Sequence, residues 1–190
     1  MDAGMLNLHA FVPRSRANGP GTRAVVWVQG CSLGCPGCYN PATHPSAGGE
    51  AVAVDDLCAR IAALGDGIEG VTVSGGEPLQ QRVGLLALLR RLRAQTRLSV
   101  LVFTGFTWDE VQHFPGAADL LACVDVLFAG RYDATRHLAQ DLRGSANKTV
   151  HFLTGRYGPA DLREVPEAEV VITADGGVVA SGIDPVRWVV

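Results

Sequence analysis

Short apolar runs alternate with amphipathic stretches through the middle of this chain, and this alternation constrains the fold more than any other feature. The segments 71–74, 98–103 and 124–128 are apolar and predict strands, whereas 54–64 and 82–93 place leucines at helical spacing. Strands that alternate with helices form a mainly parallel sheet. A complete eight-fold barrel takes about 250 residues. Because this chain has 190, we expect an α/β fold with a partial (β/α) barrel.

Further strands are predicted on both sides of this region. Segments 6–12 and 24–29 precede it, and 149–153 and 170–173 follow it, with a turn at 175–177 that predicts a closing hairpin. We find no internal repeat, low-complexity segment or linker. The sequence therefore predicts a single domain over residues 1–190, with ligands at the C-terminal ends of the strands.

Composition excludes two classes of function. Charged residues make up 18% of the chain and the net charge is −3, which argues against a basic surface for nucleic acid. No apolar run reaches the roughly 18 residues that a membrane span needs. Residues 1–11 carry no basic flank followed by an apolar block, so we see no secretory signal and expect a cytoplasmic protein.

Three cysteines lie within eight positions, directly after the predicted strand 24–29. They are Cys31, Cys35 and Cys38. In a reducing compartment such crowding indicates metal or redox chemistry. Short spacers let one loop present three thiolates to one cluster, and three ligands leave one iron of a four-iron cluster open for substrate. The lone Cys58 and Cys123 lie in apolar surroundings, which is typical of buried structural cysteines.

The spacing alone leaves an alternative. A structural zinc site could use the same three thiolates with His44 as a fourth ligand. A disulfide is disfavoured, because the third thiol would be left over.

A second motif, Gly75-Gly76-Glu77-Pro78, follows the predicted strand 71–74 and opens a helix. The glycines allow a close approach of the backbone to a ligand. Glu77 can accept a charge-assisted hydrogen bond from a ligand ammonium, and Pro78 suits a first helical turn. By itself this motif is also compatible with an ordinary turn between a strand and a helix.

Together, the Cys-x3-Cys-x2-Cys motif and the later Gly-Gly-Glu-Pro motif resemble the radical S-adenosylmethionine superfamily. The resemblance implies a 4Fe-4S cluster on the three cysteines and S-adenosylmethionine on the open iron, chelated through its amine and carboxylate. It also implies that the loop at residues 75–78 holds the amine. Gly37 stands where the backbone before the third cysteine meets the adenine. The paired motifs favour this interpretation over zinc.

A longer series narrows the resemblance to one branch. It resembles the activating proteins of anaerobic ribonucleotide reductase, which belong to the glycyl-radical-enzyme activases. This resemblance implies a glycyl radical enzyme as partner, namely the large subunit of that reductase, and reduced flavodoxin or ferredoxin as electron donor. Lys148 departs from the pattern, where a glutamine would fit better, as does 130–133. The matching segments are 19–23, 27–31, 35–40, 104–106, 142–147 and 175–177.

Two further residues are candidates for contacts with S-adenosylmethionine. Thr104 follows a predicted strand and could face the ribose or carboxylate, although a turn hydroxyl is an equal interpretation. Arg143 could pair with the carboxylate, or it could be a solvated surface arginine. Two rival functions stay open: a radical enzyme that modifies a small molecule or a peptide, and a non-catalytic zinc-binding module.

Overall fold

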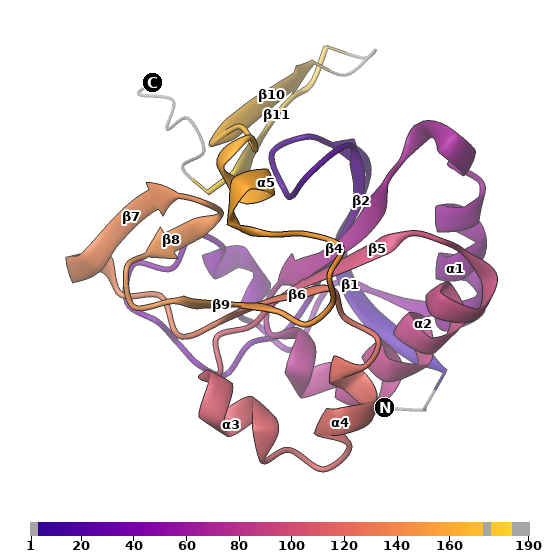
Figure 1. Cartoon of the computed structure of the whole chain (residues 1–190), viewed down its shortest axis with the longest axis horizontal. Coiled ribbons are helices and arrows are strands. Elements are labelled where there is room, and N and C mark those ends of the chain that lie inside the picture. The colour runs from indigo at the N-terminus through magenta and orange to yellow at the C-terminus, as the bar shows by residue number, and fades with distance from the viewer. Residues whose placement is uncertain (1–3, 173–175, 184–190) are drawn as a thin grey trace.

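The computed structural model describes residues 4–172 and 176–183, and a seven-stranded sheet forms its centre (Figure 1). The strands expected at 71–74, 98–103 and 124–128 are confirmed. The strands of this sheet are β1 (Met5–Ser15), β2 (Arg23–Val28), β3 (Glu50–Ala53), β4 (Gly70–Gly75), β5 (Ser99–Phe103), β6 (Val126–Ala129) and β9 (Thr149–Phe152), in the spatial order β3-β1-β2-β4-β5-β6-β9.

The middle of the sheet is parallel and its flanks are antiparallel. Strands β2, β4, β5 and β6 pair in parallel, whereas β1 runs antiparallel to β2 and β3, and β9 runs antiparallel to β6. The expected α/β class with a mostly parallel central sheet is confirmed. The sheet is open, with β3 and β9 at its edges, so barrel closure is not observed.

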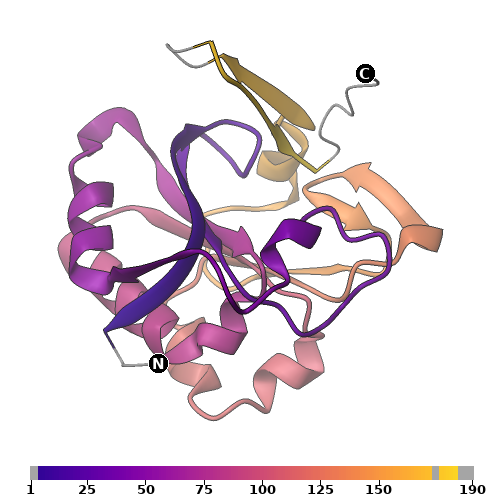
Figure 2. The ribbon, with the colours of Figure 1, turned by 180° about the vertical axis from the view of Figure 1, so that it is seen from behind.

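Helices α1 (Val54–Ala62), α2 (Arg82–Gln95), α3 (Trp108–Gln112) and α4 (Ala117–Leu121) lie on one side of the sheet (Figure 1, Figure 2). Helix α1 places Leu57 and Ile61 in the core, and α2 adds Leu85, Leu89 and Leu92 at helical spacing. The two helices expected from leucine spacing are thus confirmed, as is the burial of Cys58 and Cys123.

Alternate residues of each strand face the other side of the sheet. On β5, Val100 and Val102 belong to the core under the helices, whereas Leu101 belongs to a second, smaller core. In that second core, the rings of Phe103 and Phe128 stack with centroids 4.3 Å apart. The side chains of β2 and β4 on the same side are mostly polar or aromatic, and they build the two ends described below.

At the N-terminal ends of the parallel strands, this second face holds a buried arginine. The guanidinium of Arg23 donates to the Thr72 hydroxyl at 2.8 Å, the Ser99 hydroxyl at 2.8 Å and the Val71 carbonyl at 2.9 Å. A Cβ on Gly70 would lie 2.5 Å from the guanidinium nitrogens, so glycine leaves room for the buried cation. The opposite ends of these strands are open and form the cavity described in the next section.

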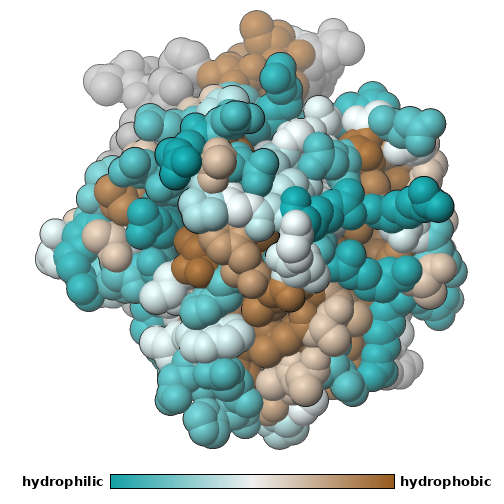
Figure 3. Space-filling view, viewed as in Figure 1, coloured by the Kyte–Doolittle hydropathy of each residue, from teal (hydrophilic) through white to brown (hydrophobic). Residues whose placement is uncertain are grey.

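Smaller elements surround this frame and were not all expected. The expected hairpin at the C-terminal end is present, but it forms a separate sheet, and residues 173–175 of its turn lie outside the described residues. Val170, Ile172 and Val178 of this hairpin are exposed, and Figure 3 shows a hydrophobic patch at the top of the molecule, where the hairpin lies. The other elements are β7 (His137–Gln140), β8 (Arg143–Ser145), α5 (Pro159–Arg163), β10 (Ala168–Ile172), β11 (Val178–Gly182) and 3-10 turns at Pro41–Thr43, Gly65–Gly67, Pro78–Gln81 and Ala134–Arg136.

None of the helices in the described residues is long and apolar enough to cross a membrane. The longest, α2, has 14 residues.

Candidate functional site

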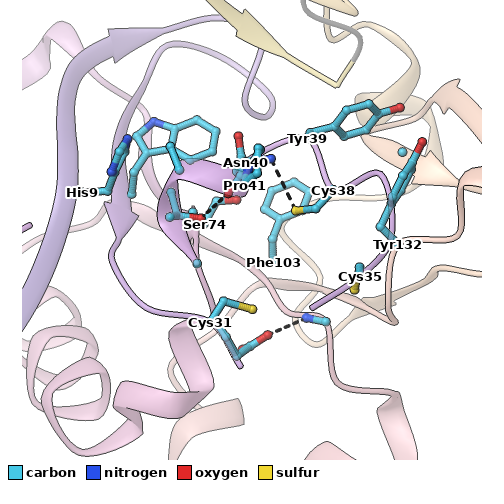
Figure 4. Close-up of a pocket in the computed structure, with 18 of the residues that line it drawn as sticks. His9, Cys31, Cys35, Cys38, Tyr39, Asn40, Pro41, Ser74, Phe103 and Tyr132 are labelled. Carbon is cyan, nitrogen blue, oxygen red and sulfur yellow. Dashed lines mark hydrogen bonds between the residues drawn. The ribbon is translucent and has the colours of Figure 1, made fainter. Parts of the chain in front are cut away.

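A cavity of about 410 Å³ opens at the C-terminal ends of β2, β4 and β5 (Figure 4). Trp27, Ser74 and Phe103 line it, one from each of these strands, and all three belong to the face opposite the helices. Cys31, Cys35 and Cys38 line the same cavity. This agrees with the expectation that ligands meet the C-terminal ends of the strands.

Backbone hydrogen bonds hold the cysteine loop at both ends. The amide of Cys31 donates to the His44 carbonyl at 3.0 Å, and the amide of Gly30 donates to the Thr43 carbonyl at 2.8 Å. Within the loop, the Cys38 amide donates to the Cys35 carbonyl at 3.1 Å. These hydrogen bonds fix the backbone of the cysteine loop at the positions of Gly30, Cys31 and Cys38.

The thiols themselves are half-buried and suited to metal binding. Burial raises the pKa of the Cys31 and Cys38 thiols, and a metal that binds thiolate would displace their protons. The sulfur of Cys38 accepts the Asn40 amide at 3.4 Å. Among residues 4–172 and 176–183, no three His, Cys, Asp or Glu side chains are gathered around a single metal-ion position. Because a four-iron cluster takes each thiolate on a different iron, its ligands stand farther apart than those of one zinc ion.

Gly75, the last residue of β4, and Gly76 bring the Gly-Gly-Glu-Pro loop against the cysteine loop. Gly75 has a φ of +105°, which an L side chain rarely adopts. A Cβ on Gly76 would lie 2.4 Å from the Gly30 carbonyl oxygen. This packing lets the Glu77 amide donate to the same carbonyl at 2.9 Å. The close backbone approach observed here is thus between the two loops.

Glu77 is buried at the floor of the cavity, with 1% of its surface exposed. Its Oε1 accepts from the Leu79 amide and the Thr104 hydroxyl, each at 2.8 Å, and its Oε2 accepts from the Gly105 amide at 2.7 Å. Burial raises the pKa of Glu77, and these hydrogen bonds oppose the rise. A carboxylate has about four acceptor positions, so one position on Oε2 is left for a ligand donor.

Lys148 supplies a positive charge to this cavity. Its ammonium donates to the Gly130 carbonyl, and burial lowers its pKa. In their ionised forms, Cys35, Glu77 and Cys38 oppose that decrease. The lysine therefore lies among the acidic groups of the site.

The expected site residues divide into two groups. Seven of them line the cavity, while Gly37, Pro78 and Arg143 are not among its lining residues. Gly37 forms a turn of the cysteine loop with a φ of +71°, and Pro78 is buried. Arg143 lies 3.6 Å from Asp141 in an ion pair. The seven lining residues are Cys31, Cys35, Cys38, Gly75, Gly76, Glu77 and Thr104.

Sequence reasoning did not identify several lining residues. The rings of Tyr39 and Tyr132 pack in a tilted arrangement with centroids 4.7 Å apart, and both residues line the cavity. His9 lines it as well and bonds to the Gln29 amide oxygen at 2.8 Å. For Trp27 a signal existed, since strand alternation places it opposite the core residues Val26 and Val28.

Comparisons with known proteins agree with this geometry. A family described as a 4Fe-4S single cluster domain matches residues 17–151. The chain is 33% identical to the anaerobic ribonucleoside-triphosphate reductase-activating protein of Salmonella typhi over 161 residues, covering 78% of this chain and 99% of that protein. The protein of the same name from Escherichia coli K12 is 34% identical, with the same coverage.

Two further similarities cover only about half of this chain. A protein of Haemophilus influenzae described as a glycyl-radical enzyme activating enzyme is 37% identical over 52% of this chain and 38% of its own length. Among solved structures, QueE from Escherichia coli is similar with a TM-score of 0.46 and 20% identity, over 54% of this chain and 53% of that one.

The family match decides between the alternatives that spacing left open. An iron–sulfur domain replaces the zinc interpretation, and the expected radical S-adenosylmethionine enzyme class, with a 4Fe-4S cluster and S-adenosylmethionine as cofactors, is confirmed. With three thiols and an acceptor carboxylate in one cavity, and with this degree of identity over most of its length, the chain belongs to the family of anaerobic ribonucleoside-triphosphate reductase-activating proteins.

Proposed function

We propose that this protein installs a glycyl radical on a partner enzyme, anaerobic ribonucleoside-triphosphate reductase. A cluster held by Cys31, Cys35 and Cys38 would supply one electron to S-adenosylmethionine; cleavage of its S–C5′ bond would give methionine and a 5′-deoxyadenosyl radical, which would take a hydrogen atom from a backbone glycine of the partner. The electron comes from an external donor, for which we propose reduced flavodoxin or ferredoxin.

The observation that carries the proposal is the shared cavity. Three thiols and the buried carboxylate of Glu77 line one space of about 410 Å³, within the range of small-molecule sites. The thiolates of Cys31, Cys35 and Cys38 would hold three irons of the cluster. The remaining acceptor position on Glu77 Oε2 suits the ammonium of S-adenosylmethionine.

Other residues of this chain orient the ligand and exclude water. We propose that Gly75 and Gly76 hold the loop of Glu77 against the cysteine loop, and that Thr104 keeps the Glu77 carboxylate in place through its 2.8 Å hydrogen bond. Trp27 and Phe103 line the cavity with apolar surface. Such surface shields a reactive intermediate from water.

The test is a spin measurement on the partner. The cluster-loaded protein is mixed anaerobically with S-adenosylmethionine, a reductant and the anaerobic ribonucleoside-triphosphate reductase of the same organism. We expect a stable carbon-centred radical on the reductase by electron paramagnetic resonance, and none when its target glycine is changed to alanine. A signal that survives the glycine change contradicts the proposal. Many turnovers of an added small molecule or peptide without a lasting protein radical would favour an enzyme that modifies such substrates.

Three coarser features accompany this proposal. We propose that residues 1–190 form one domain, and that the open sheet is the partial barrel of a radical S-adenosylmethionine enzyme. We also propose a cytoplasmic location, supported by three closely spaced free cysteines, which a reducing compartment keeps available for metal.

A further inference from the structure

Lys148 is the one lysine or arginine among the described residues that line the cavity. Its ammonium has three donors, and one of them is used on the Gly130 carbonyl. The backbone of the lysine is also held, because its amide donates to the Ser145 carbonyl at 3.1 Å. The remaining donors are therefore presented from a fixed position.

The surroundings of Lys148 favour an anionic ligand group near it. Lys148 lines the same cavity as Cys35, Cys38 and Glu77, and in their ionised forms these three groups oppose the lowering of its pKa by burial. A buried ammonium needs anionic or carbonyl partners to offset its lost hydration. The Gly130 carbonyl alone replaces only part of the hydration that the ammonium of Lys148 loses.

Arg143, the residue expected to meet the ligand carboxylate, is placed elsewhere. It is not among the cavity-lining residues, and its guanidinium pairs with Asp141. The neighbouring Leu142 and Gly144 line the cavity instead. Only a terminal nitrogen of the arginine takes part in that pair, and its Nε is buried without a hydrogen-bond partner among the described residues.

We infer that Lys148, and not Arg143, pairs with the carboxylate of S-adenosylmethionine. The inference rests on the proposed function, since it assigns a positioning residue to the same ligand. With Glu77 taking the ammonium and Lys148 the carboxylate, the two charged groups of the methionine half meet opposite charges on opposite loops. A glutamine at position 148, which would suit the family pattern, could give a hydrogen bond but no charge.

Equilibrium binding of S-adenosylmethionine to the anaerobic, cluster-loaded protein tests this inference. Iron content is measured first for the unchanged protein and for Lys148→Gln, Lys148→Arg and Arg143→Gln. We expect Lys148→Gln to retain the cluster and to bind S-adenosylmethionine about 10- to 100-fold more weakly, because a charge-assisted hydrogen bond is lost. Lys148→Arg should recover most of the affinity, and Arg143→Gln should stay within about twofold of the unchanged protein.

Each other outcome has a definite meaning. Unchanged affinity in Lys148→Gln, or a large loss in Arg143→Gln, overturns the assignment. Loss of iron in Lys148→Gln also overturns it, because the lysine would then support the cluster and not the ligand. Failure of Lys148→Arg to recover affinity would indicate a role in packing. If the unchanged, cluster-loaded protein does not bind S-adenosylmethionine, the proposed function itself fails.

Discussion

Arg23 and Glu77 are both buried charged residues near one sheet, at opposite ends of its parallel strands. Arg23 has 0% of its surface exposed, and the described residues accept six hydrogen bonds from its guanidinium. Glu77 has 1% exposed and accepts three, with one acceptor position left over. The two side chains are buried to nearly the same degree, but they differ in how many of their hydrogen-bonding positions are filled.

This difference distinguishes Arg23, whose hydrogen bonds stabilise the fold, from Glu77, which keeps one acceptor position for the proposed ligand. The five N–H donors of an arginine are all used at Arg23, so nothing is left for an outside molecule. At the other end, Glu77, Lys148 and three thiols share a cavity. The free positions of these groups suit the proposed cluster and S-adenosylmethionine.

The largest expected effect concerns the three thiols. Changing Cys31, Cys35 or Cys38 to alanine should abolish loading of the cluster, because each thiolate would hold a separate iron. Iron and sulfide analysis with the visible absorption of anaerobic protein measures this. The matched control is Cys58→Ala, which removes a buried thiol from the core under the helices and should keep full iron content. An equal loss of iron in Cys58→Ala would contradict the assignment of the cluster to the three thiols of the cavity.

The next effect concerns Arg23, at the N-terminal ends of the parallel strands. Arg23→Met should lower the free energy of unfolding by about 3–5 kcal/mol, because it leaves buried carbonyls such as those of Val71 and Ser99 without donors. Denaturant unfolding of the reduced protein without its cluster measures this. Arg60→Gln is the control, since Arg60 is exposed and its one ion pair within residues 4–172 and 176–183 is with Glu50, at 3.4 Å. A change below about 1 kcal/mol for Arg23→Met would show that saturation at this end contributes little.

The smallest expected effect concerns the open acceptor. Glu77→Gln should weaken S-adenosylmethionine binding by about 10- to 100-fold while the cluster still loads, because the ligand ammonium loses its charged acceptor. Equilibrium binding to the cluster-loaded protein measures this. Thr104→Val, which removes only one hydrogen bond to the same carboxylate, should weaken binding less. Equal losses in the two variants would mean that Glu77 acts through the tie to β5 and does not contact the ligand.

Local signals were sufficient for much of the fold. Strand alternation and leucine spacing correctly predicted β2, β4, β5 and α2, because a strand or helix must bury one face and its period is visible in the chain. The antiparallel direction of β1 and β9 was not predicted. It depends on how the 16–22 and 130–148 connections return to the sheet, which no short pattern encodes.

The sequence by itself determined that three thiols and a Gly-Gly-Glu-Pro loop follow neighbouring strands, and the two motifs together, though neither alone, indicated the chemistry of the site. Only the tertiary structure decided which charges meet there. It brought Lys148 into the cavity and left Arg143 beside Asp141, since the side to which each residue of a short strand or loop points is decided by packing against distant elements. It also showed that the Glu77 carboxylate is three-quarters satisfied by the protein, because two of its three donors, Thr104 and Gly105, come from the end of the neighbouring strand.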